Sequence, residues 1–159
     1  MNHLKQNSLI LNEDTFIDKS YSEDIVVKQG ITLTIEGYVN RLIVVIGGTV
    51  IVRGTCNRIN CINGKVHIEK KGFAHSIYAI NNCDFMIDGN VYEIITREGN
   101  KCVLNEGSVC KTILNNDSEF TIHDNVVVDT YIQIGEHAKI YMDSLCSISN
   151  FQEKKCLFY

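Results

Sequence analysis

Proline and tryptophan are both absent from the 159 residues, and several other common signals are missing too. Without proline, every backbone N–H can enter a hydrogen bond, which suits long β-ladders. Without tryptophan, a sugar-binding surface built on exposed aromatic rings is disfavoured. No apolar run approaches 18 residues, so no membrane-spanning helix is expected. The N-terminal residues also lack the apolar stretch of a secretion signal.

Positive charge is in short supply. The net charge is −4, with 15 Lys and Arg against 19 Asp and Glu, and the pI is near 5.7. Nucleic acid is therefore a poor partner, because binding phosphate requires clustered Lys and Arg. The same balance favours a cationic protein as the partner.

The seven cysteines are spaced irregularly and form no C-x-x-C pair. Their odd number and the lack of a secretion signal predict reduced thiols in a cytoplasmic, bacterial protein. Zinc sites need tighter Cys and His spacing than this. We therefore expect the cysteines to be small buried hydrophobic residues, with no metal and no cofactor bound.

Catalytic motifs are also missing. None of the five histidines lies near a G-x-S-x-G, H-E-x-x-H or P-loop sequence. The carboxylates are spread along the chain without the clear pair that cleaves a polysaccharide. His75–Ser76 and His123–Asp124 are single dipeptides, which we interpret as surface residues. The sequence thus predicts a protein that is not an enzyme and has no catalytic residue.

What is present is a loose repeat of about 18 residues, the spacing typical of a solenoid. Seven segments can be aligned, beginning at residues 32, 49, 65, 84, 101, 119 and 139. Their second and fourth positions are all apolar, and a spacing of two places both side chains on one face of a strand. The second positions are Leu33, Val50, Val66, Phe85, Cys102, Phe120 and Ile140, and the fourth are Ile35, Val52, Ile68, Ile87, Leu104, Ile122 and Met142.

A second apolar pair follows in several segments, and Gly or Asn closes most of them. The expected inward pairs are Val39 and Leu42, Cys56 and Ile59, Val91 and Ile94, and Val109 and Ile113. The closing residues tolerate the positive φ that sharp corners need: Gly47, Gly64, Asn82, Gly99, Asn116 and Gly135. Asn63, Asn81 and Asn115 recur near these ends, either as an asparagine ladder or as isolated turn residues.

Stacking such segments about 4.8 Å apart would pair every strand and bury one continuous apolar column. We therefore predict an all-β protein, a single-stranded parallel β-helix (β-solenoid) of about eight coils of 16–20 residues. A right-handed coil is expected, the favoured hand for parallel crossovers. Residues 1–159 would form one domain, with an irregular N-terminal coil over 8–30, regular coils over 31–150 and a C-terminal cap over 151–159.

The third position of each segment should point outward, yet it is largely apolar. It forms a stripe beside an acidic edge, which is the anatomy of a protein-binding patch. We predict that the partner-binding residues are Ile51, His67, Met86, Val103, Thr121 and Tyr141 in the stripe, with Glu36, Glu69 and Asp88 at its edge. Two alternatives are that the N-terminal coil covers the stripe, or that these residues reflect only β-propensity.

The run "GGTVIVRGTCNRINCINGKVHIEKKG" resembles the bactofilins, bacterial cytoskeletal solenoids that form polymers, and the resemblance extends over about residues 31–135. It implies a short parallel coil and end-to-end assembly into a scaffold.

The acidic charge and outward stripe favour a different function, an immunity or inhibitor protein that occludes a cationic bacterial toxin such as a nuclease. The charged and aromatic ending "FQEKKCLFY" suggests a capped end, and with it a monomer or small oligomer.

Overall fold

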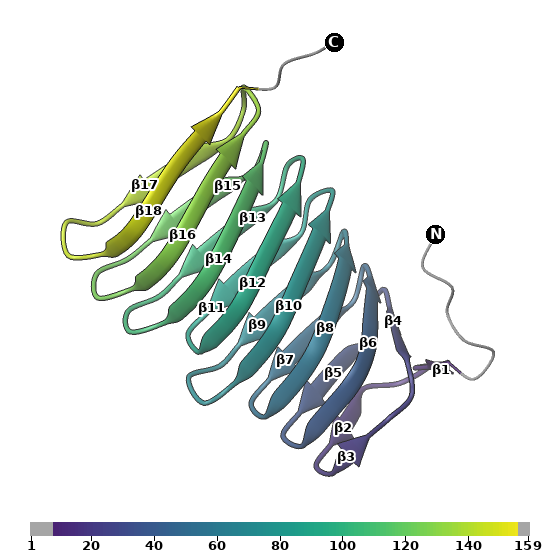
Figure 1. Ribbon diagram of the computed structural model, residues 1–159. Coiled ribbons are helices and arrows are strands. Elements are labelled where there is room, and N and C mark those ends of the chain that lie inside the picture. Colours follow the sequence, from purple (N-terminus) through teal and green to yellow (C-terminus); the bar gives the residue numbers. More distant parts are fainter. Residues whose placement is uncertain (1–7, 156–159) are drawn as a thin grey trace.

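The computed structural model describes residues 8–155, and these form eighteen strands in two sheets without a helix (Figure 1). The chain alternates between the two sheets as it advances along the solenoid axis, and it forms a β-solenoid of about eight turns. Every strand pairing within the two sheets is parallel. The predicted fold class, an all-β parallel solenoid, is confirmed.

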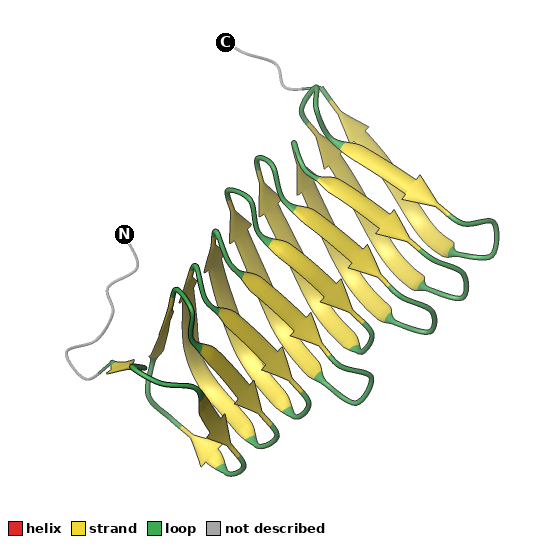
Figure 2. Cartoon of the chain, turned by 180° about the vertical axis from the view of Figure 1, so that it is seen from behind, coloured by secondary structure: helices red, strands yellow, loops and turns green. Residues whose placement is uncertain are grey.

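The two sheets differ in the length of their strands. The ten-stranded sheet, in front in Figure 1, contains mostly eight-residue strands: β1 (Leu9–Ile10), β3 (Ser20–Tyr21), β4 (Ile25–Lys28), β6 (Tyr38–Ile46), β8 (Thr55–Ile62), β10 (Phe73–Ile80), β12 (Asn90–Arg97), β14 (Val109–Asn116), β16 (Val127–Ile134) and β18 (Ser147–Lys154). The eight-stranded sheet, in front in Figure 2, contains short strands: β2 (Thr15–Ile17), β5 (Thr32–Ile35), β7 (Thr49–Val52), β9 (Lys65–Ile68), β11 (Asp84–Ile87), β13 (Lys101–Leu104), β15 (Glu119–Ile122) and β17 (Lys139–Met142).

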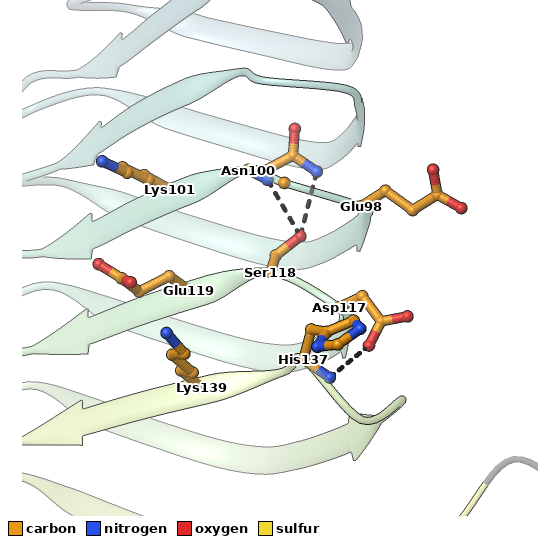
Figure 3. Close-up of a pocket in the computed structure, with 9 residues that line it drawn as sticks. Glu98, Asn100, Lys101, Asp117, Ser118, Glu119, His137 and Lys139 are labelled. Atoms are coloured by element: carbon orange, nitrogen blue, oxygen red, sulfur yellow. Dashed lines mark hydrogen bonds between the residues drawn. The ribbon is translucent and has the colours of Figure 1, made fainter.

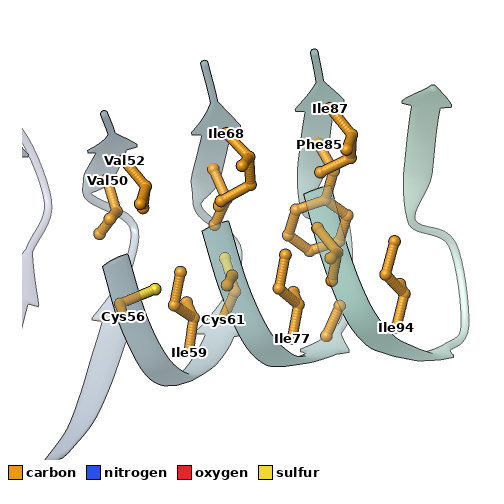
Figure 4. Packing of buried hydrophobic residues seen from close by; sticks show 14 of the residues in the cluster. Val50, Val52, Cys56, Ile59, Cys61, Ile68, Ile77, Phe85, Ile87 and Ile94 are labelled. Carbon is orange, nitrogen blue, oxygen red and sulfur yellow. The ribbon is translucent and has the colours of Figure 1, made fainter. Parts of the chain in front are cut away.

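The apolar column lies between the sheets, where side chains from successive coils stack on one another (Figure 4). Twelve of the fourteen predicted inward positions are buried, at 3% exposure or less. The two that are not, Ile140 and Met142, lie in β17, the last strand of its sheet. They pair with the inward residues Phe120 and Ile122 of β15, but in the described chain no further coil follows to cover them.

Two of the predicted second pairs are wrong by one residue. Val109 is 43% exposed and the adjacent Cys110 is buried in its place, while Ile43 rather than Leu42 is fully buried. Turn length explains the first error, and an irregularity inside β6, whose register with β8 shifts between Val39 and Leu42, explains the second. The chain takes four residues to pass from inward Ile87 to inward Val91, but six from Leu104 to Cys110, and apolar spacing alone does not distinguish these turns.

Each long strand bends once along its length. In β10, Ala74 and Ile77 are both buried although they are three residues apart, and the register with β12 passes over His75 and Tyr92. These two skipped residues stack with ring centroids 4.9 Å apart on the outside of the bend. Beyond the bend the ordinary alternation resumes, with Ala79 inward and its neighbours outward.

The corners contain residues with left-handed (positive φ) backbone, as expected. Some of these residues are the predicted ones and others are their neighbours. Gly47, Asn82, Gly99 and Gly135 have positive φ, whereas Asn63 and Asp117 take that role next to Gly64 and Asn116. Gly64 is required for another reason, since a Cβ there would lie 2.7 Å from Val45 Cγ1 and 2.9 Å from Cys61 Sγ.

The three recurring asparagines do not form one ladder. Asn63 and Asn81 occupy corner positions with positive φ, whereas Asn115 points into the core and is fully buried. The Asn115 Nδ2 donates to the Ser118 carbonyl at 2.9 Å and to the Tyr131 hydroxyl at 2.8 Å, and its Oδ1 accepts the Ser118 N–H at 2.9 Å. The Asn115 side chain thus satisfies the buried Ser118 N–H, which has no backbone acceptor, inside the apolar column.

The two ends of the solenoid differ. Residues 8–30 hold the short strands β1 to β4, and Leu11 and Ile17 are buried there. At the other end, residues 151–154 are part of β18 and do not form a separate cap, while residues 156–159 of the predicted cap lie outside the described residues. Phe151 stacks on Tyr131 at 5.3 Å but stays 42% exposed, so the last coil leaves its apolar edge open.

Candidate protein-binding face

The outer side of the eight-stranded sheet carries the predicted stripe as one continuous ladder. In the strand register from β5 to β17, each of the six predicted stripe residues pairs with the next one. The six residues therefore lie side by side on successive coils. Met86 and Tyr141 are the most exposed, at 48% and 53%. The N-terminal coil does not cover the stripe but extends it, because Phe16 of β2 pairs with Thr34 and is itself 54% exposed.

The middle of the stripe is hollowed. Four predicted residues, Ile51, His67, Met86 and Val103, line a depression of about 460 Å³ that opens onto the sheet. Its edge carries the first residues of the short strands. In those first positions Lys65, Asp84, Lys101, Glu119 and Lys139 partner one another in sequence, so charges of opposite sign alternate up the solenoid.

The predicted acidic edge is organised by cross-coil contacts. Arg53 bridges two of its carboxylates, with Nε 2.9 Å from Glu69 Oε2 and Nη1 3.4 Å from Glu36 Oε1. The third carboxylate, Asp88, lies 2.5 Å from His67 Nε2 and accepts a hydrogen bond from Asn105 Nδ2 at 2.7 Å. These partners fix where the carboxylates point.

The edge as a whole stays acidic. Its positions read Glu36, Arg53, Glu69, Asp88, Asn105, His123 and Asp143, which is four carboxylates against one arginine.

Sequence reasoning missed two features of this face. Phe16 was overlooked because β2 lies in the irregular coil, outside the seven aligned segments. The alternating charges were overlooked because they become neighbours only through the register between coils. The signal was present in the alignment as the first position of each segment.

A second hollow, of about 530 Å³, lies at the corners that lead into β13, β15 and β17 (Figure 3). The Asn100 N–H and Nδ2 both reach the Ser118 hydroxyl there, at 3.3 and 3.2 Å, and the His137 N–H donates to Asp117 Oδ1 at 2.9 Å. These contacts are turn-forming hydrogen bonds within the chain. The charged side chains around them are of mixed sign, which favours no particular ligand.

The cysteines are mostly core residues. Five of the six described ones are buried, and burial raises the pKa of Cys56 and of Cys110 to about 12. A hydrogen bond with the Cys61 thiol lowers the pKa of Cys83, but Cys83 has no exposed surface for a substrate to reach. The five buried thiols thus have the environment of structural residues.

Within residues 8–155, no cluster of three or more His, Cys, Asp or Glu side chains is arranged to hold a metal ion. That part of the chain also contains no helix long and apolar enough to cross a membrane. Comparison of the chain with family models, with curated proteins and with solved structures finds no match.

Proposed function

We propose that this protein is a non-enzymatic, acidic protein-binding module, an immunity or inhibitor protein that occludes a cationic bacterial toxin such as a nuclease in the cytoplasm. The observation that carries the proposal is the continuous outward ladder from Phe16 to Tyr141, hollowed at its centre and bordered by the acidic edge. Scattered exposed apolar residues are ordinary, but a contiguous row bordered by charge is typical of a protein-binding site.

The two parts of the face would have separate roles. Carboxylates held by Arg53, His67 and Asn105 present negative potential at fixed positions, which speeds the encounter with a cationic partner. The apolar ladder around the hollow would then be desolvated, and desolvated anchors mainly slow dissociation. The flat sheet suits inhibition by occlusion, since it can cover an active-site opening without supplying chemistry.

Binding experiments on the purified product of the neighbouring gene, measured by biolayer interferometry, test this function. Met86→Ala or Tyr141→Ala should weaken binding by about 1–3 kcal/mol through faster dissociation if either is a hot spot. The double variant Glu69→Lys and Asp88→Lys should slow association, and more strongly at low salt.

The matched control is Glu98→Lys with Glu136→Lys. It changes the net charge equally, but both residues are at corners that precede the short strands, opposite the acidic edge. If the neighbouring protein bound every variant with unchanged affinity and salt dependence, this face would not be the binding site.

The alternative function is a bactofilin-like, self-assembling scaffold, and the open last coil favours it. Met142 and Leu145 are 52% and 65% exposed, and within residues 8–155 β17 and β18 each pair with a strand on only one side. An unpaired strand edge beside an exposed apolar end is a template for another chain.

Electron microscopy of the purified protein separates the two functions. The inhibitor should remain a discrete particle at micromolar concentration. Long unbranched filaments that disappear in Met142→Lys with Leu145→Lys would instead identify the scaffold and its contact end. A surface control, Met86→Lys, should leave either outcome unchanged.

A further inference from the structure

The outer side of the ten-stranded sheet, beyond the bend, has an apolar surface that the repeat alignment did not predict. Two outward ladders cross it, and we call their members from β6 to β16 together the long-sheet face, which Lys28 in β4 and Lys154 in β18 border at its two ends. One ladder reads Val44, Asn60, Tyr78, Ile95, Leu114 and Ile132, and the other reads Ile46, Ile62, Ile80, Arg97, Asn116 and Ile134. Nine of the twelve are large apolar residues, and all twelve retain solvent exposure.

Charge is nearly absent from the long-sheet face, although the chain as a whole is acidic. No carboxylate occurs among the twelve positions, and the one charged residue, Arg97, lies over the Tyr78 ring at 5.7 Å. A cationic partner would find no anion there, and nucleic acid would find a single cation. A partner that fits must itself present a neutral, flat, aliphatic surface.

We propose that the partner is a second copy of this chain, docked by its own long-sheet face. Face-to-face sheets pack about 10 Å apart with nearly aligned strands, so ladders of Ile, Leu and Val side chains can interdigitate. The six strands would bury roughly 1,000 Å² in total, near the level at which specific interfaces begin.

The order of residues along the face suits a two-fold axis that lies parallel to the strands between β10 and β12. This axis sets β6 opposite β16, and both contribute only aliphatic residues. It sets β8 opposite β14, and each contributes one asparagine, Asn60 and Asn116. It sets β10 opposite β12, so that the strand that carries Arg97 faces the partner strand that carries Tyr78. Two of the three pairings therefore join strands of matching composition, and the third joins a strand with an aromatic ring to a strand with a guanidinium, which is a favourable pair.

Such a dimer leaves both eight-stranded sheets exposed, because the two sheets form opposite sides of the solenoid (Figures 1 and 2). The proposal is consequently independent of the proposed function. It also differs from end-to-end assembly, since a two-fold contact closes at two copies, whereas head-to-tail contacts between ends can continue indefinitely.

Sedimentation velocity over a range of protein concentrations tests the dimer. We expect the wild-type chain to be a dimer at about 50 µM. Ile80→Lys with Leu114→Lys should weaken dimerisation at least about tenfold, since the variant would bury four ammonium groups per dimer. The control, Met86→Lys with Val103→Lys, adds the same charge to the eight-stranded sheet and should leave the dimer intact. Circular dichroism should show unchanged β-structure in both variants, because all four sites point outward.

Three results would overturn the proposal. The first is a wild-type chain that stays monomeric at about 100 µM. The second is a dimer that dissociates in the Met86 and Val103 control but not in the Ile80 and Leu114 variant, which would assign the interface to the other sheet. The third is an open-ended series of oligomers that persists in the Ile80 and Leu114 variant, which would assign it to the ends.

Discussion

Ile87→Asp should abolish the folded state or lower the midpoint of thermal unfolding by about 10 °C or more. Ile87 is fully buried in β11, with coils on both sides, and none of the described core residues is a cation that could pair with a carboxylate placed there. Burying an unpaired charge or forcing its protonation typically costs about 4 kcal/mol or more, a large part of a domain's stability.

The adjacent residue provides the control. Met86 lies on the same strand but points outward, and it is 48% exposed. Met86→Asp therefore changes the same charge one residue away and should shift the unfolding midpoint by only a few degrees. Thermal denaturation followed by circular dichroism measures both. Equal stability of the two variants would mean that the inward register of β11 is wrong.

The second large effect is expected from Asn115→Ala. The substitution strands the buried Ser118 N–H and removes two further hydrogen bonds of the amide, although the Ser118 carbonyl keeps the Lys139 N–H and the Tyr131 hydroxyl keeps Gln133 Oε1. One stranded buried polar group costs about 1–3 kcal/mol when no water reaches it, and each further lost hydrogen bond costs about 1 kcal/mol, so we expect a loss of about 2–4 kcal/mol. Urea denaturation should show a lower midpoint with an unchanged slope.

Asn116→Ala is the matched control for Asn115. Asn116 is the next residue of β14, points outward and is partly exposed, so its truncation should change stability by less than about 0.5 kcal/mol. If Asn115→Ala were as stable as Asn116→Ala, the buried amide would not be holding the corner. The hydrogen bonds of the Asn115 side chain would then contribute little to the stability of the fold.

The short strands could be predicted from sequence because burial constrains them strictly. Leu33 and Ile35 in β5, like Phe85 and Ile87 in β11, repeat a two-residue apolar spacing that only an inward-facing strand requires. The long strands were harder to predict. Their bend places Ala74 and Ile77 three residues apart, which breaks the period of two and hides where the outward positions resume.

The same bend explains why the predicted stripe was found and the long-sheet face was not. Met86 and Val103 are flanked on both sides by inward residues, so their outward direction follows from alternation. Ile95 and Leu114 directly follow the inward residues Ile94 and Ile113, and each such pair reads as one apolar run. Apolar content alone could not separate the buried residue from the exposed one until the register of the coils was known.

Because each interior coil meets only the coils before and after it, the chain has a natural unit of growth by gene duplication. The strands of an added coil could pair with the coils before and after it as the existing strands do. Its turns would also fit, because the solenoid already contains turns of two lengths. Unlike an insertion into a globular core, such a change lengthens the molecule without redesigning its interior. The reach of both outer surfaces would then increase in steps of one coil, so evolution could match the length of the molecule to its partner.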